Sequence, residues 1–470
     1  MIWTSGIAFI VALVLTPIIR DIFHAYNVVD RPGFRKVHSH PIPRLGGLSV
    51  AIAYVMALAW THDASYPHSD VALGVVSSLD PLLWKLLPGV VTILLTGILD
   101  DFFNLSASYK LVGQIIAAAV AFATGLRIEA IGAISLPLVV SLPVTVFWLL
   151  LSMNAFNLID GLDGLCGGMG FVGAAALYAA ALVQENVPLQ QATLPLTGAL
   201  LGFLCYNFSR ATMFLGDSGA LLIGFLIGCS GILLTEGGGT AWNAAVPLMA
   251  VAVPVMDLSL AVVRRSLNKR PIFSADRGHI HHRLLDRGFT PRRVVLILYA
   301  WALAGACFAF LLGHPPWQRW QPFVVLGFCG TAWWGVRQLR YSEFTVAAKL
   351  FFGSELRGAA KESRRILPLA AALQRASTED EWWDLLVNTA REAGWTEMQW
   401  VREHAVRRAQ VFRSLPPSWS FSLILSDSES LRIQGTFPLA SLSIEILAFA
   451  EAVQSAFATR RDTWDRPALS

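Results

Sequence analysis

Eleven mostly apolar stretches, each about 20 residues long, run through the first 340 residues of this chain. A helix needs about 20 apolar residues to cross about 30 Å of hydrocarbon. The full chain of 470 residues is 55% hydrophobic and only 14% charged, whereas a soluble domain carries about 25% charged residues. We therefore predict an all-α polytopic membrane protein with about eleven transmembrane helices. The predicted spans are 2–20, 46–62, 82–99, 111–126, 137–154, 165–183, 193–209, 218–236, 242–263, 294–313 and 321–338.

Positive charges alternate between the loops that join these spans. Four Lys or Arg residues lie between 31 and 44, after the first span, and nine lie between 264 and 293, after the ninth. The alternate loops THDASYPHSD, QENVPLQQ and EGGGT contain no Lys or Arg. Two other loops on that side are exceptions, since they contain Arg127 and Arg319. Because Lys and Arg accumulate in cytoplasmic loops, we predict that the N-terminus is outside and the C-terminus is cytoplasmic.

The remaining composition excludes two other classes of site. A net charge of +4 is too small to argue for a nucleic-acid partner. The five cysteines lie in apolar runs with neither a C-x-x-C motif nor metal-ligand spacing, so we predict that all five are small buried side chains. They are Cys166, Cys205, Cys229, Cys307 and Cys329.

The C-terminal part has a different character. We divide the chain into a transmembrane domain at 1–340, a linker or interfacial amphipathic segment at 341–361, and a soluble cytoplasmic α+β domain of unknown role at 362–470. The last domain shows the order α-α-β-β-β-α, with strands near 397–401, 420–426 and 431–437. We interpret its Trp382, Trp383 and Trp400 as core or interface residues.

Four polar clusters interrupt the apolar pattern, and the predicted topology places all four on the cytoplasmic side. They are ILDDFFNLSASYK, NAFNLIDGLDG, FLGDSG and ADRGHIHHRLLDRGF. A charge at the bilayer centre costs about 2.5–3.5 kcal/mol even on lenient scales, so these side chains belong at helix ends. The candidate site residues in them are Asp100, Asp101, Lys110, Asn154, Asn157, Asp160, Asp163, Asp217, His279, His281 and His282.

The second cluster suggests what the acidic residues bind. Asn154 and Asn157 are three residues apart and share one helix face. Gly161 and Gly164 permit the helix to end near Asp160, which leaves the carboxylates in a wet cleft. A divalent cation would offset their charge, and Mg²⁺ is commonly held by one or two carboxylates together with substrate phosphates.

Each cluster also has an ordinary explanation. Two aspartates can simply end a helix in solvent, and G-D-S-G can be an N-cap. The H-x-H-H run can be a metal site or a polar loop, and Asp257 can be either a partnered structural carboxylate or a support for a site residue. Their convergence on one face favours an active site. A membrane transporter that uses the same carboxylates as a cation path is the alternative from another class, although transporter sites usually lie near the midplane.

These four segments, in this order, resemble the motifs of the polyprenyl-phosphate N-acetylhexosamine-1-phosphate transferase family, and the loop DRPGFRKVHSHPIPRLGG at 30–47 matches it too. The resemblance covers about residues 1–340. It implies transfer of a sugar phosphate, GlcNAc-1-phosphate by the H-I-H-H form, from a UDP-sugar to undecaprenyl phosphate with release of UMP. That step begins the assembly of cell-envelope glycans such as lipopolysaccharide, teichoic acid or peptidoglycan in a bacterial inner membrane. The branch that uses UDP-MurNAc-pentapeptide is the alternative within the family.

The resemblance also implies roles for individual residues. Asp217 and Asn157 would hold Mg²⁺, or Mn²⁺ in its place, on the diphosphate. Asp100 would deprotonate or orient the lipid phosphate, with Asp101 beside it as a support or as an indirect contact to the metal. The remaining candidates fall into four groups. Lys110, His279, His281 and His282 would clamp the diphosphate; Asp163 and Asn207 would lie near the uridine; Asn154 and Asp160 would be further site residues; and Lys36 and His38 would contact the lipid phosphate.

One departure from the family pattern concerns the segment NFSRATMFLGD. The family often has Asn-x-Pro-Pro-Ala here, and this chain has Ser209 and Arg210 in place of the two prolines. We expect Arg210 to alter the nucleotide or sugar pocket. For the reaction itself we favour direct attack by the lipid phosphate over a covalent aspartyl intermediate, and a homodimer is compatible with the sequence.

Overall fold

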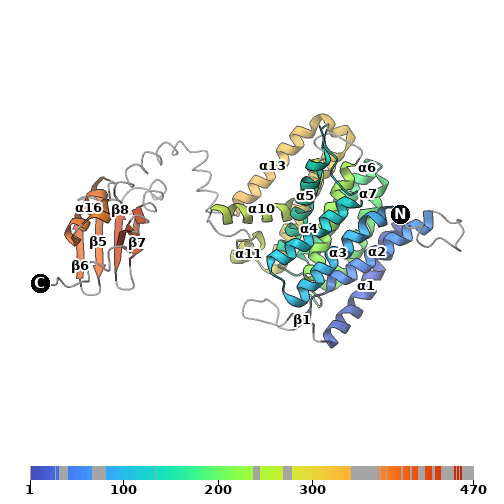
Figure 1. Ribbon diagram of the computed structural model, residues 1–470, viewed down its shortest axis with the longest axis horizontal. Coiled ribbons are helices and arrows are strands. Elements are labelled where there is room, and N and C mark those ends of the chain that lie inside the picture. Colours follow the sequence, from blue (N-terminus) through green and yellow to red (C-terminus); the bar gives the residue numbers. More distant parts are fainter. Residues whose placement is uncertain are drawn as a thin grey trace. The chain divides into compact units, whose positions relative to one another are not determined.

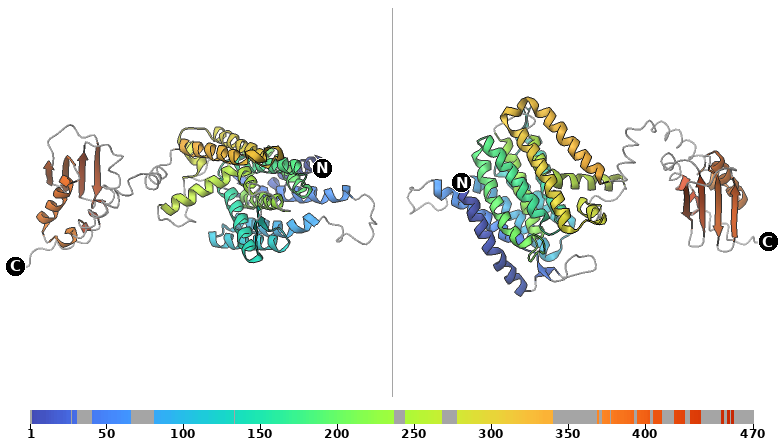
Figure 2. Two further views of the ribbon diagram at one scale, coloured as in Figure 1. Left: turned by 90° about the horizontal axis from the view of Figure 1, so that it is seen from above. Right: turned by 180° about the vertical axis from the view of Figure 1, so that it is seen from behind.

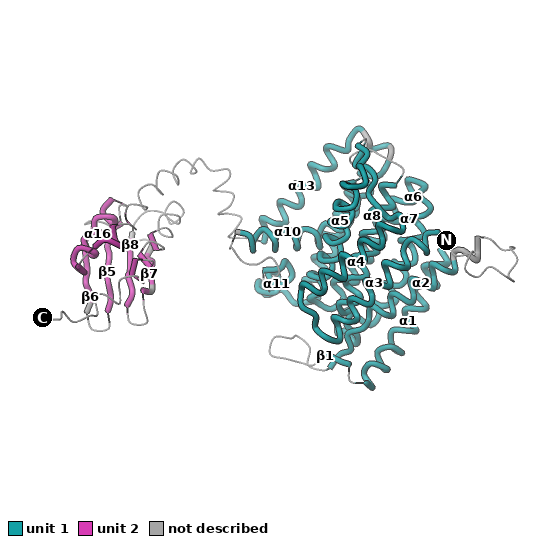
Figure 3. Tube along the Cα trace, viewed as in Figure 1, with its two compact units in different colours: residues 1–341 teal, residues 342–470 magenta. Residues whose placement is uncertain are grey.

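The computed structural model divides into two compact units, residues 1–341 and 342–470 (Figure 3). In the first unit it describes residues 2–26, 28–30, 41–65, 81–132, 134–236, 244–267 and 278–339. In the second unit it describes shorter segments between 369 and 457. The predicted linker at 341–361 lies outside the described residues.

The first unit is a bundle of helices (Figures 1 and 2). Six of its helices are long and apolar enough to cross a bilayer: α1 (Ile2–Ala25), α3 (Pro81–Phe103), α5 (Leu138–Ile159), α6 (Leu165–Val183), α8 (Gly216–Thr235) and α12 (Pro291–Gly313). The other helices are α2 (Gly46–Ser65), α4 (Ala107–Ala123), α7 (Val187–Asn207), α9 (Ala245–Ala250), α10 (Ala252–Leu267), α11 (Ile280–Asp286) and α13 (Gln321–Gln338). The prediction of a mostly helical membrane protein is confirmed, and the count of eleven spans stays a prediction.

The ninth predicted span is not one continuous helix. It is interrupted at Val251, between α9 and α10, where φ is −115° and ψ is 30°. Pro254 has no backbone N–H, so it cannot bond to the carbonyl of Ala250 one turn earlier, and a proline ring crowds that carbonyl as well. The sequence-based span missed this break because hydropathy does not register a missing hydrogen bond.

Helix α8 is the centre of the bundle. In its most apolar stretch 94% of the residues are buried, against 28–67% in the other five candidate spans. Helices α2, α3, α5 and α6 all contact it. Two short hairpins join neighbouring helices: β1 (Val29–Asp30) with β2 (Ile42–Pro43), and β3 (Ala130–Ile131) with β4 (Ile134–Ser135).

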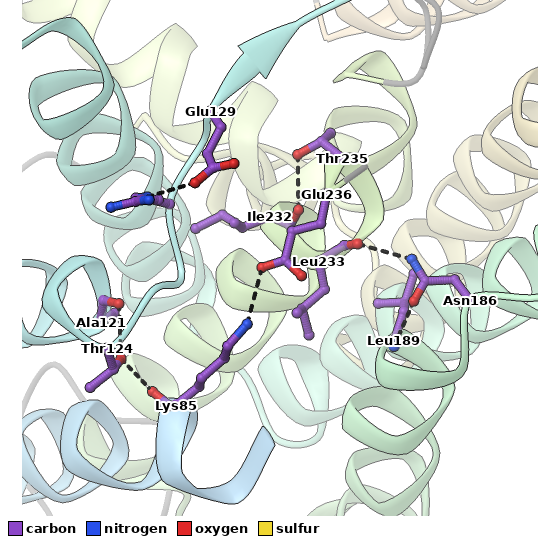
Figure 4. A network of polar contacts seen from close by, with 11 residues as sticks. Lys85, Ala121, Thr124, Glu129, Asn186, Leu189, Ile232, Leu233, Thr235 and Glu236 are labelled. Carbon is purple, nitrogen blue, oxygen red and sulfur yellow. Dashed lines mark hydrogen bonds and ion pairs between the residues drawn. The ribbon is translucent and has the colours of Figure 1, made fainter. Parts of the chain in front are cut away.

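Helices α3 and α8 run antiparallel and are joined by polar contacts at both ends. Near the start of α3, the ammonium of Lys85 lies 3.7 Å from the carboxylate of Glu236, directly after α8 (Figure 4). Burial raises the pKa of Glu236, and the positive charge of Lys85 opposes that shift. Asp100 lies fifteen residues beyond Lys85, or about 22 Å along the helix at about 1.5 Å per residue. We call that opposite end, where α3 ends and α8 begins, the site end.

The second unit is an antiparallel sheet with helices packed on one face. The strand order is β6-β5-β8-β7, from β5 (Glu397–Arg402), β6 (Ala405–Gln410), β7 (Trp419–Ile424) and β8 (Ser430–Gly435). Its core is built around Trp382 and Trp383 of α16 (Glu379–Glu392) and Trp400 of β5, as predicted for core residues. The prediction of three strands was wrong, because the edge strand β6 carries Arg407 and Arg408 and lacks an apolar alternation.

The cysteine prediction was only partly correct. Cys166 and Cys229 are buried, whereas Cys205, Cys307 and Cys329 are exposed on the surface of the chain. The outer faces of spanning helices contact lipid, so an apolar run does not imply burial inside the protein.

The close approach of α3 to α8 generates a first prediction. A Cβ on Gly97 would overlap the Cα of Ser218, which is backbone and cannot rotate away. Gly97→Ala is therefore expected to force the helices apart and to lower the free energy of unfolding by about 1–3 kcal/mol. Thermal unfolding in detergent measures this. Gly330→Ala is the matched control, because nothing lies within 4 Å of a Cβ there; equal unfolding temperatures for the two variants would contradict the prediction.

Candidate active site

Four helix ends bring together two carboxylates, an ammonium and an amide. Lys110 Nζ lies 2.5 Å from Asp100 Oδ2 and 3.1 Å from Asp217 Oδ1. The amide of Asn157 donates a hydrogen bond to the same Asp217 oxygen. Asp100 lies in the last turn of α3, Lys110 in the first turn of α4, Asn157 in the last turn of α5 and Asp217 in the first turn of α8. We call these four residues the acid–lysine cluster.

Asp101 has a different task from its neighbour Asp100. Its Oδ1 accepts the backbone N–H of Asp217 at 2.8 Å, and its Oδ2 accepts the N–H of Ser218 at 3.0 Å. A carboxylate on the free N–H groups at a helix N-terminus satisfies both the missing hydrogen bonds and the helix dipole. Gly216 precedes them with φ at +74°, and a side chain there would collide with the Asp101 carboxylate. Asp101 therefore fixes the place of Asp217.

The turn after α5 is held by two other predicted residues. Asp163 Oδ2 accepts the N–H of Ala211 at 2.9 Å. Asn207 Oδ1 accepts the N–H of Gly164 at 3.0 Å, and its Nδ2 donates to the carbonyl of Met213 at 2.9 Å. Both side chains thus tie the 160–164 turn to the 208–214 segment that leads into α8.

Asp160 ends α5 and is half-buried. Burial raises the pKa of its carboxyl well above the usual value, and the negative charges of Asp217, Asp101 and Asp163 raise it further. That coupling places Asp160 in the electrostatic neighbourhood of the acid–lysine cluster. A carboxyl that is costly to ionise in a cleft is a candidate site residue.

Asn154 and Asn157 take different partners. Asn154 Nδ2 donates to Gln114 Oε1 of α4 at 2.8 Å and to the carbonyl of Leu150 at 2.8 Å. Of the two predicted asparagines, only Asn157 contacts a carboxylate of the cluster. The buried Gln114 was missed because a lone glutamine in an apolar run carries no motif.

The histidine segment forms α11, which packs against the 160–164 turn. His281 is buried with 2% exposure, and a Cβ on Gly161 would overlap its Nε2 atom. Burial lowers the pKa of His281 to about 4, with the charge of His282 acting in the same direction. Burial therefore favours the neutral form of His281, and its role in clamping the diphosphate stays a prediction. Its ring stacks on that of His279 at a centroid distance of 5.9 Å and lies 4.2 Å from that of His282.

The two described ends of the 30–47 loop lie at the same end of the bundle, beside the approach to α8. Lys36 and His38 lie outside the described residues, but both ends of that loop are fixed. At its base Arg44 forms an ion pair with Asp30. The segment after it pairs with the strand-like approach to α8: the N–H of Phe214 donates to the carbonyl of Pro43 at 2.8 Å, and that of Gly47 donates to the carbonyl of Leu215 at 2.9 Å.

The departure at Ser209 and Arg210 has a backbone counterpart. Their φ angles are +53° and +73°, in the left-handed region. Proline fixes φ near −65°, so two prolines could not adopt this conformation. Both side chains are exposed. The 208–214 segment of this chain therefore has a turn that the Pro-Pro form of the motif cannot make.

The acid–lysine cluster fits a Mg²⁺ ion held partly by substrate. No group of three or more His, Cys, Asp or Glu side chains in ligating arrangement occurs among the described residues. Asp217 carries one carboxylate, and Asn157 would offer its amide oxygen after rotation of the amide group. Mg²⁺ commonly takes one or two carboxylates and completes its shell with phosphates and water, so this donor set fits such an ion and not a fully protein-bound one.

Comparison with known proteins agrees with this geometry. The sequence profile of glycosyl transferase family 4 matches residues 83–235. The chain is 34% identical over 305 residues to a "probable undecaprenyl-phosphate N-acetylglucosaminyl 1-phosphate transferase" of Bacillus subtilis, covering 62% of this chain and 80% of the relative. It is 35% identical over 322 residues to a "decaprenyl-phosphate N-acetylglucosaminephosphotransferase" of Mycobacterium tuberculosis, covering 63% and 78%.

A third relative is more distant but is covered further. It is an "undecaprenyl-phosphate alpha-N-acetylglucosaminyl 1-phosphate transferase" of Yersinia pestis, 28% identical over 349 residues, or 70% of this chain and 91% of the relative. The chain is thus a multi-pass membrane protein of the glycosyl transferase class. It belongs to glycosyl transferase family 4, the polyprenyl-phosphate N-acetylhexosamine-1-phosphate transferases, and the family resemblance of its five motifs is confirmed.

The raised pKa of Asp160 predicts a pH-dependent stability. The folded-state pKa of Asp160 lies above its unfolded value of about 3.9. Ionisation of Asp160 therefore lowers the free energy of unfolding as pH rises, and this loss is absent below the unfolded pKa. Asp160→Asn is therefore expected to raise the melting temperature at pH 8 and to match wild type below about pH 4. Thermal unfolding in chelator measures this. Asp163→Ala, which removes the acceptor for Ala211, should instead lower the melting temperature at both pH values.

The left-handed turn at Ser209 and Arg210 generates a third prediction. Glycine adopts positive φ without the cost of about 1–2 kcal/mol that other residues bear, so Arg210→Gly should raise the free energy of unfolding by up to about 1 kcal/mol. Arg210→Pro should lower it, because the ring forbids the observed φ. Denaturation curves for both variants give the test. A proline variant as stable as wild type would show that Arg210 does not adopt the left-handed conformation.

Proposed function

We propose that this protein transfers GlcNAc-1-phosphate from UDP-GlcNAc to a polyprenyl phosphate, undecaprenyl phosphate in bacteria, and releases UMP. The acid–lysine cluster is the observation that carries the proposal. Four helices deliver two carboxylates, one ammonium and one amide to a single end of the bundle, and the relatives named above carry this activity in their names.

The cluster suits in-line phosphoryl transfer, which needs a neutralised diphosphate and a positioned nucleophile. Asp217 and Asn157 would hold Mg²⁺ or Mn²⁺, which when bound supplies positive charge to the diphosphate. Asp100 then faces the lipid phosphate as the group that orients it or takes its proton. Lys110 lies between Asp100 and Asp217. Its ammonium is placed to stabilise the negative charge that moves from the nucleophile to the departing UMP.

We favour direct attack of a lipid phosphate oxygen on the β-phosphorus of the donor. The bond between that phosphorus and the oxygen bridging to UMP breaks as the new phosphorus–oxygen bond forms. Asp101 is fully engaged on the N-terminus of α8, and Asp100 is held by Lys110. Neither carboxylate needs to act as a covalent carrier, since the acceptor brings its own phosphate oxygen.

The site end would face the cytoplasm in the inner membrane. The Lys and Arg residues of the loops around 31–44 and 264–293 support this orientation. UDP-sugars would then reach the site from the cytoplasm, while the lipid phosphate would enter from the inner leaflet. Transporter sites usually lie near the midplane, whereas the residues of the acid–lysine cluster lie within about one turn of four helix ends.

The proposal predicts metal-dependent turnover that depends on the cluster. Purified protein should release UMP from UDP-GlcNAc only with undecaprenyl phosphate and Mg²⁺, and chelator should abolish the release. Asp217→Asn and Asp100→Asn should each lower kcat by about a hundredfold or more. UDP-MurNAc-pentapeptide should be a poor donor.

The matched control is Glu236→Gln, the same acid-to-amide change at the opposite end of α3 and α8. It should leave UMP release within about twofold of wild type, because its partner Lys85 lies about 22 Å along the helix from Asp100. Full activity in both aspartate variants, or ion flux in proteoliposomes without any UMP release, would refute the proposal.

A further inference from the structure

Asp257 is a buried carboxylate that none of the site motifs includes. It lies in α10 with 1% exposure and makes two contacts, both to the start of the histidine segment. Its Oδ2 lies 2.9 Å from Nδ1 of His279, and its Oδ1 accepts the backbone N–H of Ile280 at 2.8 Å. A buried carboxylate is costly unless it is partnered, and these two contacts supply that partnership.

The two contacts fix both the position and the chemistry of His279. The Ile280 bond anchors the backbone where α11 begins. The other oxygen determines which ring nitrogen carries a hydrogen. A carboxylate accepts hydrogen bonds and does not donate them, so Nδ1 of His279 must carry a hydrogen. Nε2 is then the ring nitrogen left for a ligand, and a phosphate oxygen there would require Nε2 to carry a hydrogen too, with the Asp257 carboxylate facing the resulting imidazolium.

The three histidines therefore differ. His281 is neutral and has both ring nitrogens buried without a hydrogen-bond partner in the described part of the chain. It fills the space beside Gly161, where a Cβ would overlap its Nε2. His279 stacks parallel to it at 5.9 Å and contacts the carboxylate of Asp257. His281 thus connects the Asp160–Gly161 turn to His279 by packing.

We infer that Asp257 is a positioning residue for phosphate transfer: it holds His279 by Nδ1 and so presents Nε2 to a phosphate oxygen of the nucleotide-sugar. This inference rests on the proposed function, because the anion is the donor of that reaction. Asp257 itself touches no substrate. It acts through His279, as carboxylates do behind histidines in other enzymes, where their loss typically costs about 10–100-fold.

Asp257→Asn separates the two contacts of this residue. An amide oxygen can keep the bond to the N–H of Ile280, while the amide nitrogen, a donor, replaces the acceptor at Nδ1 of His279. The ring must then accept at Nδ1, and the carboxylate charge that faces the ring is lost. A double-mutant cycle with His279→Gln measures this coupling. If Asp257 were purely structural, Asp257→Asn would lower activity by the same factor whether or not the histidine is present.

The experiment measures UMP release for wild type, Asp257→Asn, His279→Gln and the double variant. We expect Asp257→Asn alone to lower kcat/KM by about 10–100-fold and to lower it by less than about threefold in the His279→Gln background. The melting temperature of Asp257→Asn should stay close to that of wild type, since the Ile280 bond is kept. Equal losses in both backgrounds would overturn the inference, and so would an Asp257→Asn protein that fails to fold.

A second measurement on the same four proteins needs no turnover. The rise in melting temperature caused by UDP-GlcNAc with Mg²⁺ reports donor binding, and Asp257→Asn should reduce that rise only where His279 is present. If wild type binds the donor but releases no UMP, the proposed function fails while this cycle still tests Asp257. A ligand-induced rise that is the same in all four proteins would overturn the role of Asp257 in donor binding, whatever the turnover shows.

Discussion

The carboxylate of Asp101 on the N-terminus of α8 is the interaction on which the rest of this site depends. It joins the end of α3 to the start of α8 through two backbone N–H groups, and it does so where Gly97 and Gly216 let the two backbones approach closely. Asp100 precedes Asp101 and Asp217 follows Gly216. One anchored turn therefore sets the separation of the two carboxylates that face Lys110, and any change in that anchor moves both of them.

Charge compensation explains why this arrangement is possible at the end of a membrane bundle. Three ionised side chains, Asp100, Asp217 and Lys110, would each be costly alone in a low-dielectric environment. Lys110 lies within 3.1 Å of both carboxylates, so the cluster as a whole carries one negative charge. One net negative charge suits the metal-bound diphosphate that we propose as its ligand, because the ion would neutralise most of the diphosphate's charge. The opposite ends of the same two helices are joined by the partly exposed ion pair of Lys85 and Glu236, which is a simpler structural contact.

The sequence predicted the helical membrane class, the family and the residues of the acid–lysine cluster, because hydropathy and motif order are local properties. It did not predict the break at Val251, which follows from the missing N–H of Pro254, or the edge strand β6, whose arginines hide its strand character. It assigned Asp101 a supporting role beside Asp100 but could not predict which groups either side chain contacts. Their separate contacts depend on α8, more than 100 residues away, and no local pattern carries that information. Asp257 and Gln114 were underrated for the same reason, since each is a lone polar residue whose meaning lies in a distant partner.

The carboxylates around the site, together with Asn207, fall into two groups by what their side chains bind. Asp101, Asp163, Asn207 and Asp257 each accept a hydrogen bond from a backbone N–H of a different segment. These bonds hold the start of α8, the 208–214 turn, the 160–164 turn and the start of α11. Asp100, Asp217 and Asp160 accept none from the backbone of any described residue, and two of them face Lys110 instead. A carboxylate already committed to backbone donors has little capacity left for a substrate or metal, so the chemistry falls to the uncommitted group, while the committed group determines where that chemistry takes place.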